Sequence, residues 1–241
     1  MGKAIRLDKY MADMGMGTRS EVKVFIKKGR VSVDDEVVKQ AEYKVDIEKQ
    51  CVTLDGERIG YAQYEYFMLN KPAGYLSATE DGKGATVLDL LPQELQKQGL
   101  FPVGRLDKDT EGLLLLTNEG GLAHNLLSPK HHVDKVYYTR VAGKLTKEDC
   151  QAFEAGMVLA DGLVCQSAGL EILSVGEESE AHVTLREGKF HQVKRMLAAR
   201  GKPVLYLERV KMGNLTLDPS LSRGKYRFLS DDEVELLRKN S

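Results

Sequence analysis

The segment of residues 104–118, GRLDKDTEGLLLLTN, joins a charged loop to four consecutive leucines. A polar run that a glycine closes, followed by a short apolar run, is typical of a turn that enters a buried strand. A loop fixed to such a strand can hold reactive groups at defined positions, so Asp107 and Asp109 are candidates for chemistry. The alternative is a surface turn in which Asp109 or Thr110 caps the backbone, as most loop carboxylates do.

Positive charge is clustered in this 241-residue chain, although its formal net charge is only −1. Residues 1–33 contain eight Lys or Arg against three acidic residues, and residues 186–211 contain eight against two. Clustered charge attracts phosphate whatever the total charge of the protein. The pattern therefore favours a nucleic acid held at two places, and two solvated helix faces are the alternative.

Several classes of protein are excluded by what the sequence lacks. The apolar runs are too short for a membrane span, and residues 1–6 contain no apolar signal core. The three cysteines and five histidines show no disulfide or zinc spacing. Motifs of phosphate loops, dinucleotide sites, zinc proteases and serine hydrolases are missing. We expect a cytoplasmic protein that uses carboxylate, tyrosine and basic side chains without a metal or cofactor.

Residues 1–60 are predicted to form a compact unit of two helices and a small sheet. Apolar side chains recur at helical spacing in residues 6–14. Thr18 stands three residues before Glu21, the pattern of a capping box, and begins a second helix that Gly29 ends. Short strands separated by turn residues follow at 31–33, 37–38 and 51–54.

Three stretches of this unit resemble the S4 family of RNA-binding domains, namely residues 6–10 (RLDKY), 18–21 (TRSE) and 26–34 (IKKGRVSVD). The resemblance implies that the basic second helix grips structured RNA, and Lys and Arg commonly position proteins on phosphates. Docking of an acidic protein is the alternative. The residues expected to contact RNA are Arg6, Arg19, Lys23, Lys27, Lys28 and Arg30.

A second domain is predicted over residues 67–241, after a linker at residues 61–66. Strands are expected at 67–70, 113–116, 135–143, 170–173, 181–185, 203–207 and 213–217. A helix that Pro92 interrupts early is expected at 86–98, and further helices are expected at 120–127, 146–156, from 188 and from 230. Strands and helices alternate irregularly, so we expect an α+β domain with a mixed or antiparallel sheet and flanking helices, rather than a doubly wound fold.

Four stretches of this second domain, in order, resemble the RsuA-type pseudouridine synthases. They are residues 69–74 (LNKPAG), 104–118, 135–137 (KVY) and 187–196 (EGKFHQVKRM). Together with the S4-like unit in front, they make a specific combination. The resemblance implies isomerisation of a uridine in RNA, in which the N1–C1′ bond is broken and the base is rejoined through C5.

The same resemblance implies roles for individual residues. Asp107 starts cleavage of the glycosidic bond as nucleophile or base, and a nearby cation favours its charged form. Tyr137 stacks on the extruded base and serves in removing the C5 proton, because aromatic stacking offsets the cost of base flipping. Arg105 helps the base leave its helix. Lys194 stands where the wider superfamily commonly has an arginine that pairs with the Asp, and Arg195 is the alternative partner.

The remaining expectations concern binding. Lys71, His191 and Arg195 are expected to face RNA, whereas Asp109 and Thr110 are expected only to hold the loop. Ribosomal RNA is the expected partner of a monomeric protein that does not bind membranes, with small-subunit 16S RNA as substrate and large-subunit 23S RNA as the alternative. A non-catalytic ribosome-assembly factor and a nucleosidase that releases uracil are the competing classes.

Overall fold

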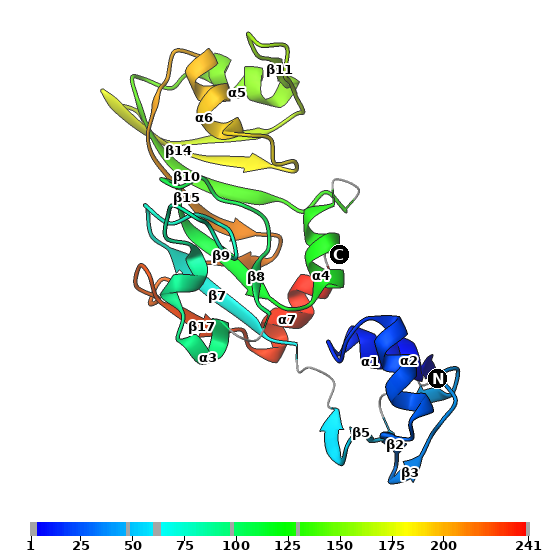
Figure 1. Ribbon diagram of the computed structural model, residues 1–241. Coiled ribbons are helices and arrows are strands. Elements are labelled where there is room, and N and C mark those ends of the chain that lie inside the picture. Colours follow the sequence, from blue (N-terminus) through cyan, green and yellow to red (C-terminus); the bar gives the residue numbers. More distant parts are fainter. Residues whose placement is uncertain (1–3, 47–48, 60–63, 97–98, 129–130, 240–241) are drawn as a thin grey trace. The chain divides into compact units, whose positions relative to one another are not determined.

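The computed structural model describes residues 4–46, 49–59, 64–96, 99–128 and 131–239, which fall into two compact units, Met1–Tyr64 and Glu65–Ser241 (Figure 1). Residues 61–63 of the expected linker lie outside the described residues. The first strand of the second unit begins at Tyr66, one residue before the predicted start of the domain.

The N-terminal unit contains two helices and short strands, as predicted. The elements are β1 (Ala4–Arg6), α1 (Leu7–Asp13), α2 (Arg19–Lys27), β2 (Val31–Val33), β3 (Glu36–Val37), β4 (Lys44–Asp46), β5 (Val52–Leu54) and β6 (Glu57–Ile59). The capping box is confirmed, because Glu21 N–H donates to Thr18 Oγ1 and Thr18 N–H donates to the Glu21 carboxylate. The pairing of β1 with β4 was not predicted, since its two strands are far apart in sequence.

The second unit contains one long mixed sheet, which confirms the predicted α+β class. Its strands are β7 (Tyr66–Lys71), β8 (Phe101–Pro102), β9 (Glu111–Thr117), β10 (Lys135–Ala142), β13 (Gly169–Ser174), β14 (Glu178–Leu185), β15 (Val204–Met212), β16 (Leu215–Thr216) and β17 (Tyr226–Phe228). The main order is β13-β14-β10-β15-β9-β7-β17, with β15–β9 as its parallel pair. A separate hairpin pairs β11 (Met157–Val158) with β12 (Val164–Cys165).

The helices of this unit are η1 (Val87–Leu90, a 3-10 helix), α3 (Gln93–Gln96), α4 (Gly120–Leu127), α5 (Lys147–Ala155), α6 (Gln192–Ala199) and α7 (Asp231–Arg238). Pro92 interrupts the helix expected at 86–98, as predicted, because it separates η1 from the short α3, and residues 97–98 of that expected helix lie outside the described residues. The helix expected from 188 begins only at Gln192, after His191 adopts a left-handed backbone with φ 50°.

The leucines of β9 place the sheet between two apolar layers. Leu113 and Leu115 pack with α4 and α7, whereas Leu114 and Leu116 pack with the cluster that contains residues of η1, α5 and α6. This alternation follows from the two-residue period of a strand, and the leucine run is unbroken because both faces are buried. Figure 1 shows α5 and α6 at one end of the sheet, beside β10 and β14. The predicted leucine strand is therefore the buried support of the loop before it.

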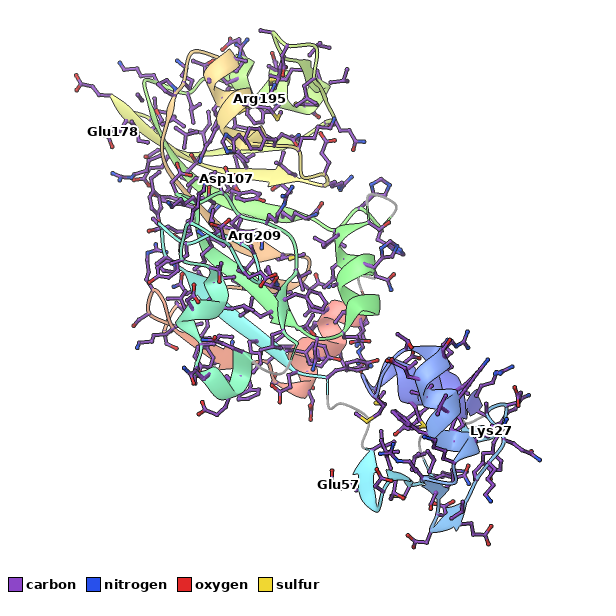
Figure 2. All side chains as sticks on the ribbon, viewed as in Figure 1. Lys27, Glu57, Asp107, Glu178, Arg195 and Arg209 are labelled. Carbon is purple, nitrogen blue, oxygen red and sulfur yellow. The ribbon has the colours of Figure 1, made fainter. Side chains whose placement is uncertain are left out.

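Gly112 lies where the two halves of the sheet meet. It pairs with Arg209 across the short parallel contact of β9 with β15. Its φ is +95°, and a Cβ there would stand 2.4 Å from the carbonyl oxygen of Arg209. Arg209, labelled in Figure 2, is buried and donates from Nε to the carbonyl oxygen of Leu113 at 2.8 Å. No side chain fits at position 112 unless these strands separate.

We expect Gly112→Ala to lower the free energy of unfolding by more than about 2 kcal/mol, because a strained left-handed residue alone costs roughly 1–3 kcal/mol. Urea denaturation measures the change. Gly120→Ala is the matched control, since its methyl group enters open space at the start of α4. Equal stability of the two variants would contradict this account of the strand junction.

Candidate active site

The ammonium group of Lys71 lies beneath the charged loop. Lys71 ends β7, its side chain is fully buried, and Nζ donates to the carbonyl oxygens of Asp107, Lys108, Thr110 and Pro72 at 2.8–3.2 Å. Burial lowers the pKa of Lys71 to about 8, so the group remains mainly charged at neutral pH. The expectation that Lys71 contacts RNA is therefore wrong, because its ammonium serves the backbone of the loop.

Other polar contacts fix the rest of the loop backbone. Ser77 Oγ accepts from the N–H of Leu106 at 3.0 Å and donates to the carbonyl oxygen of the same residue at 2.9 Å. The N–H of Gly74 donates to the carbonyl oxygen of Lys108 at 2.7 Å, and that of Thr110 donates to the carbonyl oxygen of Asp107 at 3.1 Å. Hydrogen bonds therefore fix the backbone both before Asp107, at Leu106, and after it, at Lys108 and Thr110.

The carboxylate of Asp107 faces basic groups of α6 and the turn before it. Lys194 Nζ lies 3.2 Å from Asp107 Oδ2, and His191 Nε2 lies 3.6 Å from Oδ1. Arg195 instead pairs with Asp161 at 2.5 Å. Of the two basic residues expected as partner of Asp107, the structure therefore places Lys194 against it, and Figure 2 shows Asp107 and Arg195 apart.

Asp109 shares the cation of Asp107. Its Oδ1 accepts a hydrogen bond from Lys194 Nζ at 2.5 Å, although the side chain is 74% exposed. This bond holds the pKa of Asp109 below its ordinary value. The expectation that Asp109 only holds the loop is incomplete, because it also positions Lys194. Sequence spacing gave no signal of this contact, which spans 85 residues.

A small cavity of about 70 Å³ brings the predicted residues together. Asp107, Arg105 and His191 line it with Tyr137, which is nearly buried on β10. Its apolar lining consists of Leu106, Leu185, Val193 and Leu207. Larger hollows of about 420 and 550 Å³ lie elsewhere, beside Cys150 and His131. We assign the site to the smaller cavity because it combines a carboxylate, a cation and an aromatic ring over an apolar surface.

Gln192 fixes the turn that carries His191 and leads into α6, the helix that carries Lys194. Its buried side chain accepts from the N–H of Lys189 at 3.0 Å and donates to the Glu187 carboxylate at 2.6 Å. Beyond this turn, α6 packs into the core through Val193, Met196 and Leu197. The resulting arrangement leaves the polar side of the helix against the loop of Asp107.

The basic residues of the N-terminal unit differ in how far they are neutralised. Arg6 pairs with Asp8 and Glu42, Lys23 lies 3.8 Å from Asp8, and Arg30 pairs with Asp55. By contrast, three of the six N-terminal residues expected to contact RNA are exposed and make no ion pair with any described residue, namely Arg19, Lys27 and Lys28. Figure 2 shows Lys27 on α2. Among those six residues, these three cations are the most available to phosphate.

Two family models match the chain. The RNA pseudouridylate synthase model matches residues 65–199, and the S4 domain model matches residues 5–51. The chain belongs to the RNA pseudouridylate synthase family. Members of this family are isomerases that convert uridine in RNA to pseudouridine, and the N-terminal unit is an S4 domain. Within the described residues, no helix is long and apolar enough to cross a membrane.

Relatives match along almost the whole chain. The uncharacterized RNA pseudouridine synthase YtzG of Bacillus subtilis is 45% identical over 98% of this chain and 99% of its own length. Ribosomal small subunit pseudouridine synthase A of Vibrio cholerae is 40% identical over 98% of this chain and 100% of its own length. A solved structure described as a pseudouridylate synthase is 36% identical, covers 97% of this chain and 99% of its own, and has a TM-score of 0.69.

Replacing the buried ammonium should disturb both stability and activity. We expect Lys71→Met to lower the free energy of unfolding by about 1–3 kcal/mol, because buried carbonyl groups lose their donor. Pseudouridine formation should fall as the loop of Asp107 loosens. The matched control is Lys108→Met, which removes an exposed lysine from the same loop. If Lys71→Met behaved like this control in denaturation and in activity, the ammonium would not organise the loop.

Proposed function

We propose that this chain isomerises a uridine of small-subunit (16S) ribosomal RNA and that Asp107 is the residue that starts the reaction. The observation that supports this proposal is the position of Asp107 at the cavity. Its backbone carbonyl accepts a hydrogen bond from Lys71, and its carboxylate lies 3.2 Å from Lys194 Nζ. Relatives named ribosomal small subunit pseudouridine synthase A, at 36–40% identity, support the choice of RNA. The proposal also places the protein in the cytoplasm, where ribosomal RNA is its substrate.

The reaction needs no co-substrate, because its product has the same atoms as its substrate. The N1–C1′ bond breaks, the uracil ring turns, and a C5–C1′ bond forms. C5 then loses its proton, and N1 ends with one. Asp107 would act on the sugar as nucleophile or base, which requires an ionised carboxylate. Lys194 compensates that charge at 3.2 Å without needing to leave its place on α6.

Tyr137 is the proposed contact of the extruded base. Tyr137 is 9% exposed and lines the cavity beside Leu185 and Leu207, so a uracil there would meet one aromatic and two aliphatic side chains. Stacking of this kind offsets the few kcal/mol that base flipping costs. The phenol oxygen is the proposed group that assists removal of the C5 proton.

Arg105 is proposed to guide the base out of its helix. It lines the cavity and is exposed, and it makes no ion pair with another described residue. A free guanidinium at the mouth of the cavity can bind the phosphate of the extruded nucleotide. The S4 domain would add phosphate contacts through Arg19, Lys27 and Lys28, and these increase affinity without reading sequence.

Exchange of the catalytic carboxylate tests the proposal. With small-subunit RNA labelled with tritium at C5 of uridine, we expect Asp107→Asn to slow tritium release at least about a hundredfold, because acid–base groups typically contribute 10²–10⁴-fold. Asp109→Asn is the matched control, since it also contacts Lys194 but is exposed, and it should keep most of the activity.

Other outcomes separate the competing functions. Undiminished release by Asp107→Asn would contradict the role of Asp107. Wild-type release from large-subunit RNA alone would overturn the choice of substrate. Free uracil among the products would indicate a nucleosidase. If Asp107→Asn supported ribosome assembly like the parent while loss of Arg19, Lys23 and Lys27 did not, RNA binding without chemistry would be the function.

A further inference from the structure

Phe190 is the most exposed of the large hydrophobic residues in the described chain, with 73% of its surface accessible. It belongs to none of the three apolar clusters of the described residues. Its ring stacks on the imidazole of His191, with centroids 3.8 Å apart and planes inclined by 19°. One face of the phenyl ring is thus backed by a flat side chain, whereas the residue as a whole lies open to solvent.

The backbone that presents this pair is strained. His191 has a left-handed conformation, with φ 50° and ψ 33°, immediately before the first turn of α6. Such a conformation is uncommon for residues other than glycine, and strained residues of this kind gather at binding and active sites. Packing of the core does not explain the exposed ring, which therefore points to a ligand.

His191 connects the exposed ring to the active site. Its Nε2 lies 3.6 Å from Asp107 Oδ1, and it lines the same cavity as Tyr137 and Arg105. Phe190 stacks on this imidazole and does not itself line the cavity. The phenyl ring is consequently the next flat surface outward from the place proposed for the target uracil.

We propose that Phe190, backed by His191, is a stacking platform for the nucleobase adjacent to the extruded uridine. The inference rests on the proposed function, in which one uridine of an RNA occupies the cavity. Extruding that uridine leaves its neighbour with an uncovered face, and an aromatic ring can cover the face whatever the base is. The platform would hold the opened RNA while Asp107 acts.

Variants of the full-length protein test the aromatic requirement. Loss of one base–aromatic stack corresponds to roughly a 5- to 150-fold effect. We expect Phe190→Ala and Phe190→Leu to reduce kcat/KM for pseudouridine formation by this factor, and Phe190→Trp to preserve it. All three should melt like the parent because the side chain is exposed. Val158→Ala, which trims another highly exposed apolar residue, should leave kcat/KM unchanged.

Substitution of the RNA then identifies the stacked base. The probe is a short RNA around the uridine that the wild-type protein modifies, with an abasic site at either neighbouring nucleotide. At one of the two positions the abasic site should lower wild-type activity, and Phe190→Ala should cause no further loss on that RNA. If Phe190→Ala caused the same loss of activity on intact RNA and on both abasic RNAs, the proposal would be overturned.

Two further results would also overturn it. In one, Phe190→Leu retains full activity, which would indicate apolar contact without stacking. In the other, the loss appears only on ribonucleoprotein particles and not on bare RNA, which would indicate contact with a protein. Failure of the proposed substrate is distinguishable, because the modified uridine would then map to another RNA. The abasic test would be made on a fragment around that uridine.

Discussion

A single buried ammonium group holds together the loop on which the chemistry depends. Lys71 Nζ donates to four backbone carbonyls, three of which belong to residues 107–110. A buried cation is costly without partners, so these carbonyls and the ammonium stabilise each other. A fixed backbone therefore holds the carboxylate of Asp107 in place. A flexible loop would instead have to lose conformational entropy in each catalytic cycle.

The sheet brings distant segments to this loop. β9 leads out of the loop between two apolar layers, and Gly112 allows β15 to approach its backbone closely. Next to β15 lies β10, which carries Tyr137. The helix α6 packs in the same apolar cluster as Tyr137 and supplies Lys194. Carboxylate, aromatic ring and cation thus come from three separate elements, and their convergence is a property of the sheet order.

Local features of the sequence predicted much of this structure. The leucine strand, the capping box at Thr18 and the ααβ unit follow from short-range pattern, and the family resemblance supplied Asp107 and Tyr137. The contacts that were missed are long-range. Lys71 lies 36 or more residues from most of its acceptors, and Asp109 lies 85 residues from Lys194. No periodicity encodes such distances, so the sequence predicts an RNA contact at a lysine that the fold buries.

Amide hydrogen exchange tests most directly whether Lys71 organises the catalytic loop. The N–H groups of Gly74 and Thr110 donate to the carbonyls of Lys108 and Asp107, which are also acceptors of the ammonium. In Lys71→Met these two amides should exchange faster than in the parent, whereas the amides of β14 should keep their protection. Unchanged protection of Gly74 and Thr110 would contradict the account.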